Sequence, residues 1–332
     1  MKPSNPQAPD RPRRALLTAA SLWAAAGGSG ALAQLAGRAL RIFVAAPPGG
    51  TPDVVARNFG ARMGGAAGLA VENRPGAAGL LAVSAMMQAP ADGNATLLGH
   101  SGLATMYPFL YPRLPYDAVA DLVPVAPAAE TAFGLAVGPA VPAEVQTLAD
   151  YVRWARADVT RATYGTPGIG TLPHILGALL AREGGFEARH IAYGGGPPAI
   201  NDLVGGRLSS VVLPDGLLRQ LHQAGRLRIL ATSGPARQPT LPGVPTLVEE
   251  GFKSLVVREW WGFFVPRGTP GAAIDALAAV VHSAAVAPEL MTALDTLGLR
   301  ALSGTGAQMA ERVRRERAYW RDVLPTLGIR ME

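Results

Sequence analysis

Three segments of the sequence combine glycine with hydroxyl-bearing residues in a pattern suited to holding an anion. They are 48–53, 99–105 and 165–171, and each lies between a short apolar run and a segment with helical periodicity. A turn at that position presents unpaired backbone N–H groups at a helix start, where the helix dipole also favours negative charge. We therefore expect main-chain donors and hydroxyl groups to bind a carboxylate, without a buried lysine. The hydroxyl donors would come from Thr51, Ser101, Thr166 and Thr171.

Taken singly, each glycine turn is better explained by a plain connection between a strand and a helix. Three such turns on elements that face one another favour ligand binding. The remaining question is whether any of them completes a catalytic motif.

No complete enzyme motif is present. No glycine turn is followed by Lys-Ser or Lys-Thr, which excludes a nucleotide P-loop. Residues 99–103 resemble a nucleophile elbow, but Leu103 stands where the second glycine belongs, so a hydrolase built on Ser101 is only a minor alternative. Residues 165–170 have the wrong glycine spacing for a dinucleotide site. The five histidines lack metal-site spacing and there is no cysteine, so we expect no metal, no cofactor and no enzyme activity.

Short strands and helices alternate along the chain and must position these turns. Strands are predicted at 40–45, 96–98, 162–164, 190–193, 209–213 and 227–232, and residues 71–72 lead into a turn at 73–76. Helices are predicted at 53–63, 80–88, 152–157, 172–181, 197–204 and about 309–324. Repeated strand, turn and helix predict an α/β fold with parallel sheets and ligand sites at the carboxyl ends of the strands. Proline-rich segments at 139–142 and 235–245 are the expected crossings between two lobes.

The N-terminus has the pattern of an export signal. Arg11, Arg13 and Arg14 precede an uncharged apolar stretch at 15–28, and residues 31–33 (Ala-Leu-Ala) fit signal-peptidase cleavage after Ala33. A membrane anchor or a flexible tail are the alternatives, and the route, Sec or twin-arginine, is open. Without cysteine there is no lipid attachment site, so we expect a periplasmic protein.

Charge and aromatic content exclude other partners. The formal charge of +6 falls to +3 without residues 1–33, and the densest basic run forms one face of the C-terminal helix. That pattern does not predict nucleic-acid binding. Aromatic residues make up 6%, which disfavours a sugar site built on stacked rings.

The chain resembles the substrate-binding receptors of tripartite tricarboxylate transporters, the Bug family, from about Leu40 to its C-terminus. The blocks that carry the resemblance lie at 47–53, 72–76, 114–117 with 124–125, 168–174, 190–196, 202–206, 224–228, 241–246 and 261–270. Each block is weak alone, and their common order is specific. The resemblance implies a type II periplasmic-binding-protein clamshell, with each lobe a mainly parallel sheet flanked by helices. One lobe would comprise 34–135 and 230–332, and the other 136–229.

The resemblance also implies a function and a set of ligand-binding residues. The protein would capture a small organic acid and deliver it to membrane permease subunits, working as a monomer; presentation of the closed form to a sensor kinase is the alternative. The first lobe would contribute Gly49, Gly50, Thr51, Asp53, Ser101 and Gly102, and the second lobe Thr166, Gly168, Gly170 and Thr171. Two departures affect the far side of the pocket. Gly194 replaces a basic residue, and the expected acid is present only as Asp215, for which a helix cap is the alternative role.

Overall fold

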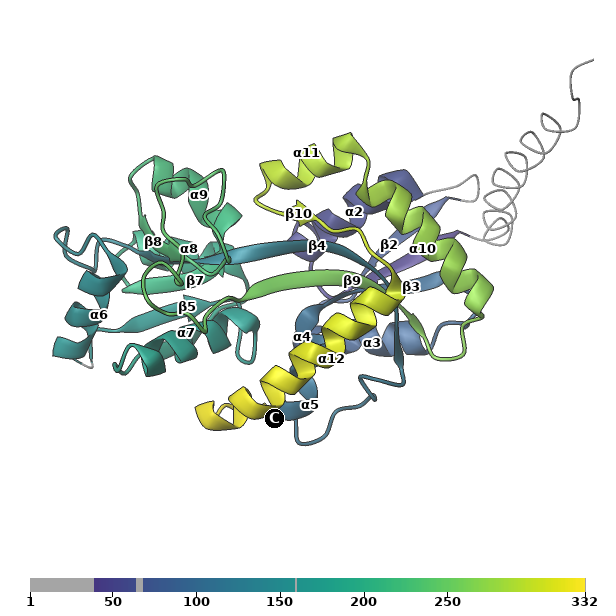
Figure 1. Ribbon diagram of the computed structural model, residues 1–332, viewed down its shortest axis with the longest axis horizontal. Coiled ribbons are helices and arrows are strands. Elements are labelled where there is room, and N and C mark those ends of the chain that lie inside the picture. The colour runs from purple at the N-terminus through teal and green to yellow at the C-terminus, as the bar shows by residue number, and fades with distance from the viewer. Residues whose placement is uncertain (1–38, 64–67, 159, 332) are drawn as a thin grey trace, which may run out of the picture.

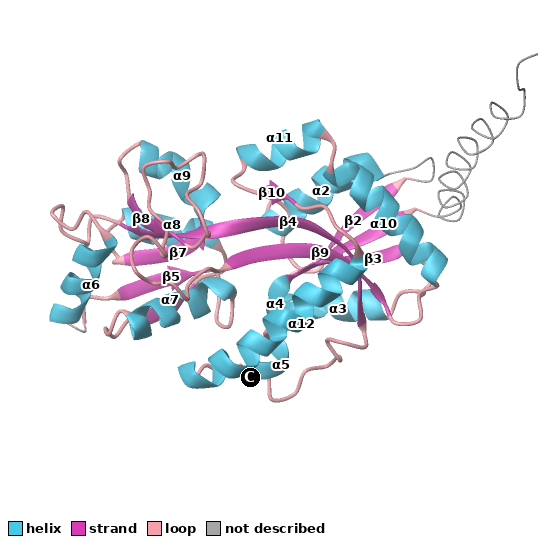
Figure 2. Cartoon of the chain, viewed as in Figure 1, coloured by secondary structure: helices cyan, strands magenta, loops and turns pink. Residues whose placement is uncertain are grey.

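The computed structural model describes residues 39–63, 68–158 and 160–331. Within them the chain forms a ten-stranded mixed sheet with helices on both faces, arranged as two lobes side by side (Figures 1 and 2). The α/β prediction is confirmed. The signal predicted at 1–33 lies outside the described residues.

The first lobe is built on three parallel strands whose carboxyl ends share one edge. The strands are β1 (Leu40–Val44), β2 (Leu69–Asn73) and β3 (Ala95–His100), in the order β2-β1-β3. An antiparallel strand, β9 (Arg258–Pro266), continues the sheet beyond β3. The helices of this lobe are α2 (Thr51–Met63), α3 (Leu80–Met87), α4 (Ser101–Thr105), α5 (Tyr107–Leu110), α10 (Gly271–Ala285), α11 (Pro288–Thr296) and α12 (Gly306–Val323).

Successive residues of these strands point to opposite faces of the first-lobe sheet, and because nearly all of them are apolar, both faces are buried. Phe43 and Leu97 belong to the core beneath α3 and α12, while Ile42 and Leu98 belong to the core beneath α2 and α10. A strand buried on both faces reads as a continuous apolar run, which is why the sequence predicted β1 correctly.

The second lobe repeats the plan with fewer elements. Its parallel strands are β5 (Thr163–Thr166), β6 (Arg189–Ala192) and β7 (Ser210–Pro214). Its helices are α6 (Leu148–Ala157), α7 (Leu172–Glu183), α8 (Gly196–Val204) and α9 (Asp215–Gln223). The fourth strand, β8 (Arg228–Thr232), runs antiparallel to β4.

A single long strand, β4 (Leu122–Val137), belongs to both lobes (Figure 1). It pairs with β9 as far as Ala132 and with β7 and β8 from Phe133 onward. The short strand β10 (Arg300–Ala301) pairs with its first half. The first crossing therefore lies within β4, and the prediction of a crossing at 139–142 was wrong. The strand was not predicted from the sequence because Pro124 and Pro127 interrupt its pattern. The structure tolerates both prolines because they lie beside register shifts in the pairing of β4 with β9.

The chain returns to the first lobe along the segment between β8 and β9. Ser233 accepts a hydrogen bond from Val257 N–H at 3.0 Å, and its hydroxyl accepts the Phe133 N–H at 2.9 Å. Strand pairing thus groups β8 with the second lobe, whereas the sequence-based division assigned residues from 230 onward to the first.

A cluster of ion pairs attaches α12 to the crossing strands. The Glu130 carboxylate, 5% exposed, contacts Arg258, Arg300 at 2.5 Å and Arg312 at 3.2 Å. Burial would raise the pKa of Glu130, but the three arginines outweigh it and hold the pKa below its usual value. The charged carboxylate therefore belongs to the folded structure.

Across the described ranges, no single helix has both the length and the apolar character needed to cross a membrane. Helices α10 and α11 meet those criteria only together, and they are bent by 68°.

Candidate functional site

The turns that follow β1, β2 and β3 lie next to one another at the carboxyl edge of the first-lobe sheet. Ligands in open α/β sheets bind at this edge. Two of the three turns are those singled out from the sequence, after β1 and after β3. The third, at 74–79 after β2, was not among the three predicted anion-binding turns.

The turn after β1 is held by a buried carboxylate. Asp53 is 2% exposed and accepts the Gly49 N–H at 2.8 Å, the Asn73 amide at 2.8 Å and the Arg57 guanidinium at 3.0 Å. Burial would raise the pKa of Asp53, but the bonds from Arg57, Gly49 and Asn73 outweigh it and lower the pKa. All of these contacts are internal, so Asp53 positions the turn.

The backbone N–H groups of both glycines in this turn are hydrogen-bonded within the turn, so neither is available to a ligand. Gly49 N–H bonds to Asp53, and Gly50 N–H bonds to Pro47 O at 3.1 Å. The positive φ of Gly49, +79°, explains why glycine stands there. In the described part of the chain no group forms a hydrogen bond with the Thr51 hydroxyl, which leaves it as the polar side chain of this turn that is available to a ligand.

The turn after β2 contains two left-handed alanines. Ala77 and Ala78 have φ of +45° and +51°, a conformation that costs roughly 1–2 kcal/mol per non-glycine residue. It is held by the Ala78 carbonyl, which accepts the Tyr107 hydroxyl at 2.9 Å and lies 3.4 Å from His100 Nε2. Neither alanine N–H has a partner among the described residues. Strain of this kind often marks a binding loop, and no single-sequence pattern would have revealed it.

The hydroxyl of Ser101, at the end of β3, is already engaged. Ser101 is 2% exposed and donates to Glu259 Oε1 at 2.5 Å. Burial, with a contribution from Glu316, raises the pKa of Glu259 to about 7, against the stabilising effect of Ser101. Glu259 is only half-buried and was missed, because a lone acid in an aromatic strand gives no sequence signal.

The second-lobe turn after β5 is stabilised by internal hydrogen bonds. The Thr171 hydroxyl donates to Gly168 O at 2.7 Å, and Gly170 N–H donates to His174 Nδ1 at 3.0 Å. The buried Thr166 hydroxyl lies 2.7 Å from His190 Nε2. The predicted residues are thus together in one turn, but their named donors are directed inward.

Asp215 lies where α9 meets the first lobe. Its carboxyl is 3% exposed, and Oδ2 has no partner; burial raises its pKa to about 7. The backbone at Gly216 packs against Leu297, and Arg219 donates to Thr296 O at 2.6 Å. The backbone N–H of Gly216, in the first turn of α9, opposes this rise in pKa more than any other group.

No hydrogen bond or ion pair among the described residues joins the two sets of predicted residues. The lobes touch instead through α9 and the Leu297 turn, and through the C-terminal segment. There Met331 N–H bonds to Leu110 O at 2.9 Å in the first lobe, while its side chain packs on Gly170 in the second. No group of three or more His, Asp or Glu within the described ranges could hold a metal ion.

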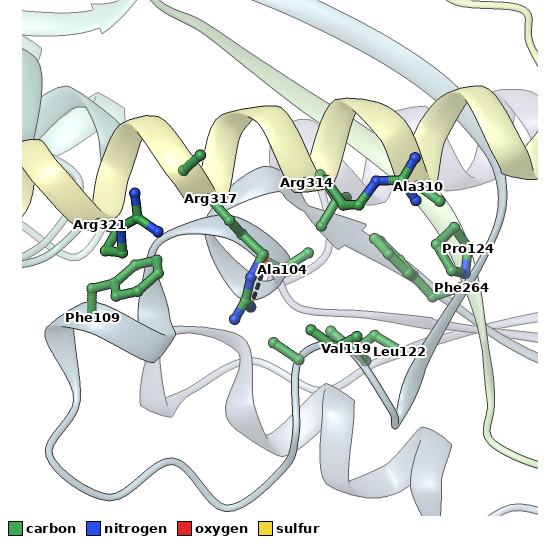
Figure 3. Close-up of a pocket in the computed structure, with 13 residues that line it drawn as sticks. Ala104, Phe109, Val119, Leu122, Pro124, Phe264, Ala310, Arg314, Arg317 and Arg321 are labelled. Atoms are coloured by element: carbon green, nitrogen blue, oxygen red, sulfur yellow. Dashed lines mark hydrogen bonds between the residues drawn. The ribbon is translucent and has the colours of Figure 1, made fainter.

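A separate groove of about 560 Å³ lies beneath α12 on the first lobe (Figure 3). Its walls include Phe109, Val119 and Phe264, and Arg317 reaches into it to donate to Ala104 O. Ala104, near the end of the 99–105 segment, is the one lining residue that belongs to the three turns, and none of the predicted ligand-binding residues lines the groove, so it is not part of the candidate site.

Two α/β lobes joined by crossing strands, with turns gathered at their carboxyl edges, define a solute-binding protein of the periplasmic-binding-protein class. The sequence pattern of the tripartite tricarboxylate transporter family receptor matches residues 42–329. The chain belongs to that family, as its sequence blocks predicted.

Individual relatives agree with the assignment. The UPF0065 protein in the tcbD-tcbE intergenic region of Pseudomonas sp. (strain P51) is 34% identical over 281 residues, covering 84% of this chain and 83% of that protein. The periplasmic binding protein BugD has a TM-score of 0.80 at 25% identity, covering 89% of this chain and 99% of that one. R. palustris Rpa4515 with adipate has a TM-score of 0.80 at 28% identity, with the same coverage. MatC from Rhodopseudomonas palustris with bound malate has a TM-score of 0.75 at 26% identity, covering 87% and 99%.

Proposed function

We propose that this protein captures a small organic acid between its lobes in the periplasm and delivers it to the permease subunits of a tripartite transporter. Family membership supports the role, and the adipate and malate held by similar structures support a carboxylate as the ligand. The observation that carries the proposal is the first-lobe edge, where the Thr51 hydroxyl and the Ala77 and Ala78 N–H groups have no partner in the described chain.

In this proposal the predicted residues divide into contacts and supports. Thr51 and the 77–78 backbone donate to one ligand carboxylate, while Gly49, Gly50 and Asp53 fix the shape of their turn. The Ser101–Gly102 segment forms the adjacent wall. From the second lobe, the 166–171 turn, including Gly168 and Gly170, covers the ligand as the lobes close, and Asp215 flanks the contact between lobes.

The proposal includes no catalytic step. In hydrolases with a nucleophile elbow, the base that takes the serine proton is a histidine. The Ser101 hydroxyl donates to Glu259, while the His100 ring faces Ala78 O and the Tyr107 ring. A Ser-His arrangement for ester hydrolysis is therefore not supported by the geometry.

We also propose export with cleavage after Ala33, and a monomeric mature protein. Intact mass measurement of periplasmic material would give a chain that begins at Gln34. Light scattering of the same sample would give the mass of one chain. A cytoplasmic, full-length product would contradict the export proposal.

Calorimetric titration and thermal shift of the mature protein with mono-, di- and tricarboxylates test the function. A ligand that binds only the folded protein raises the unfolding midpoint as its concentration increases. Thr51→Val removes the hydroxyl at nearly constant volume and should weaken binding about tenfold, equivalent to ~1.4 kcal/mol. Thr292→Val, on the exposed face of α11, is the matched control and should bind normally. Failure of every carboxylate to bind would refute the proposal.

A further inference from the structure

Besides Asp53, the first-lobe edge of the candidate site contains a second carboxyl group, that of Glu259. In the antiparallel pairing of β3 with β9, His100 is opposite Trp261. Glu259 comes two residues earlier in β9, so it lies just beyond the carboxyl end of β3, beside the Ser101 turn. Ser101 is almost fully buried, whereas Glu259 is only half-buried. Glu259 therefore offers more surface to a ligand at this wall than Ser101 does.

No cation neutralises Glu259 within the described ranges. The neighbouring Arg258 pairs with Glu130, and Arg312 on α12 pairs with Glu130 and Glu316. The other titratable groups near Glu259 are Glu316, whose charge disfavours a second negative charge, and Tyr107 on α5. Among the described side chains Ser101 alone donates to it, at Oε1, and the backbone N–H groups of Ser101 and Trp260 also stabilise its charge.

This environment has a clear preference among ligand groups. An ionised carboxylate can accept about four hydrogen bonds and cannot donate, so Oε2 retains acceptor capacity. A ligand carboxylate placed against it would bring like charges together in a partly desolvated site, which is unfavourable. A ligand hydroxyl or ammonium group would instead supply a further donor to this remaining acceptor capacity.

We propose that Glu259 is a specificity-determining residue that selects carboxylates bearing a hydroxyl or amino group over the corresponding unsubstituted acids. The inference rests on the proposed function, because it assumes that a carboxylate binds in this cleft. The ligand's carboxylate would lie at Thr51 and the 77–78 backbone, and its hydroxyl or amino group at Glu259. In this arrangement the charge of Glu259 prevents a ligand carboxylate from binding at Ser101.

Matched ligand series test the inference on the mature protein. Succinate, malate and aspartate share one carbon skeleton, as do adipate, 2-hydroxyadipate and 2-aminoadipate. In the series that binds, a substituted acid should bind at least about tenfold more tightly than the unsubstituted one at pH 8, equivalent to ~1.4 kcal/mol. Glu259→Gln keeps the side-chain volume and removes the charge. It should strengthen binding of the unsubstituted acid and bring the ratio within about threefold.

A control variant tests whether the change in ligand preference is specific to Glu259, and two further outcomes separate this inference from the receptor proposal. Glu311→Gln makes the same chemical change on the exposed side of α12 and should leave the ratio unaltered. Equal affinity for substituted and unsubstituted acids in the unmodified protein, or an unchanged ratio in Glu259→Gln, would overturn this inference while leaving the receptor proposal intact. Absence of binding by all six acids and by the wider carboxylate panel would overturn both.

Discussion

His174 and His190 stack face to face, with ring centroids 3.8 Å apart and an interplanar angle of 15°. Each ring holds one side of the second-lobe turn, His174 through Gly170 N–H and His190 through Thr166. Burial lowers the pKa of both to about 4, and the neighbouring His190 contributes to the shift at His174. Both rings are therefore neutral near pH 7, and His174 Nδ1 is an acceptor.

His174→Ala should loosen this turn. It leaves the Gly170 N–H without its acceptor, at an expected cost of about 1–3 kcal/mol in the free energy of unfolding. Chemical denaturation at pH 7 would measure the loss. His282→Ala, on the exposed face of α10, should cost much less. Equal losses in the two variants would argue against a positioning role for His174.

The same histidines predict an acid sensitivity. A histidine whose pKa is lowered by folding adds stability that is complete above its unfolded pKa, near 6.5, and is lost as the pH falls toward 4. The unfolding midpoint should therefore fall as the pH decreases across that window, and less steeply in His174→Ala. Parallel curves for the variant and the unmodified protein would contradict the assignment.

Asp53→Ala should weaken ligand binding without direct loss of a ligand contact. It frees Gly49 N–H and the Asn73 amide, so the turn that carries Thr51 loses its anchor. We expect a cost of about 2–3 kcal/mol in stability and at least about tenfold in affinity. Calorimetry and denaturation on the same sample would separate the two effects. Asp53→Asn, which retains the size of the side chain, should be affected less.

Asp215→Asn should stabilise the protein at alkaline pH. A carboxyl whose pKa is raised by folding adds stability below its unfolded pKa, near 4, and loses it as the pH rises through about 7. At pH 8 the buried charge costs on the order of 2–4 kcal/mol, which the amide avoids. The unfolding midpoints measured at pH 5 and pH 8 should differ less in Asp215→Asn than in the unmodified protein. Asp121→Asn, on an exposed turn, should retain the dependence of the unmodified protein.

Glu130→Gln should destabilise the attachment of α12 to the crossing strands. It removes the charge shared by Arg258, Arg300 and Arg312 and leaves these partly exposed cations facing one another. A buried carboxylate removed from its partners costs about 3–5 kcal/mol, and partial exposure of the arginines reduces this to about 2 kcal/mol. Denaturation in low and high salt would measure it. A neutral outcome would mean that the cluster makes no net contribution.

The ligand preference set by Glu259 should depend on pH. Its pKa of about 7 means that it becomes protonated as the pH falls from 8 to 6, and the penalty against an unsubstituted acid then declines. The affinity ratio between malate and succinate, or between their adipate counterparts, should shrink across that range. In Glu259→Gln the ratio should stay flat.

The sequence predicted most elements of the two lobes because local patterns determine them. Buried strands such as Leu40–Val44 and amphipathic helices such as α12 have their own periodicity. The long strand β4 escaped, since Pro124 and Pro127 interrupt the pattern that reveals strands. The sequence predicted which turns form the site but not which groups in them can donate hydrogen bonds to a ligand. Contacts between distant residues, such as Asn73 with Asp53, determine which N–H groups remain free.

The shared strand β4 also sets the order in which the protein can fold. Its first half is paired with β9, and β3 reaches β9 as well, through a Thr96 hydroxyl bond to Phe264 O that spans 168 positions of the chain. The first lobe cannot complete its sheet until the last third of the chain is available. Long-range pairing of this kind slows folding. The first lobe of a chain built this way would stay incomplete until β9 is available, and an incompletely folded polypeptide is easier to thread through a narrow translocation channel than a folded one.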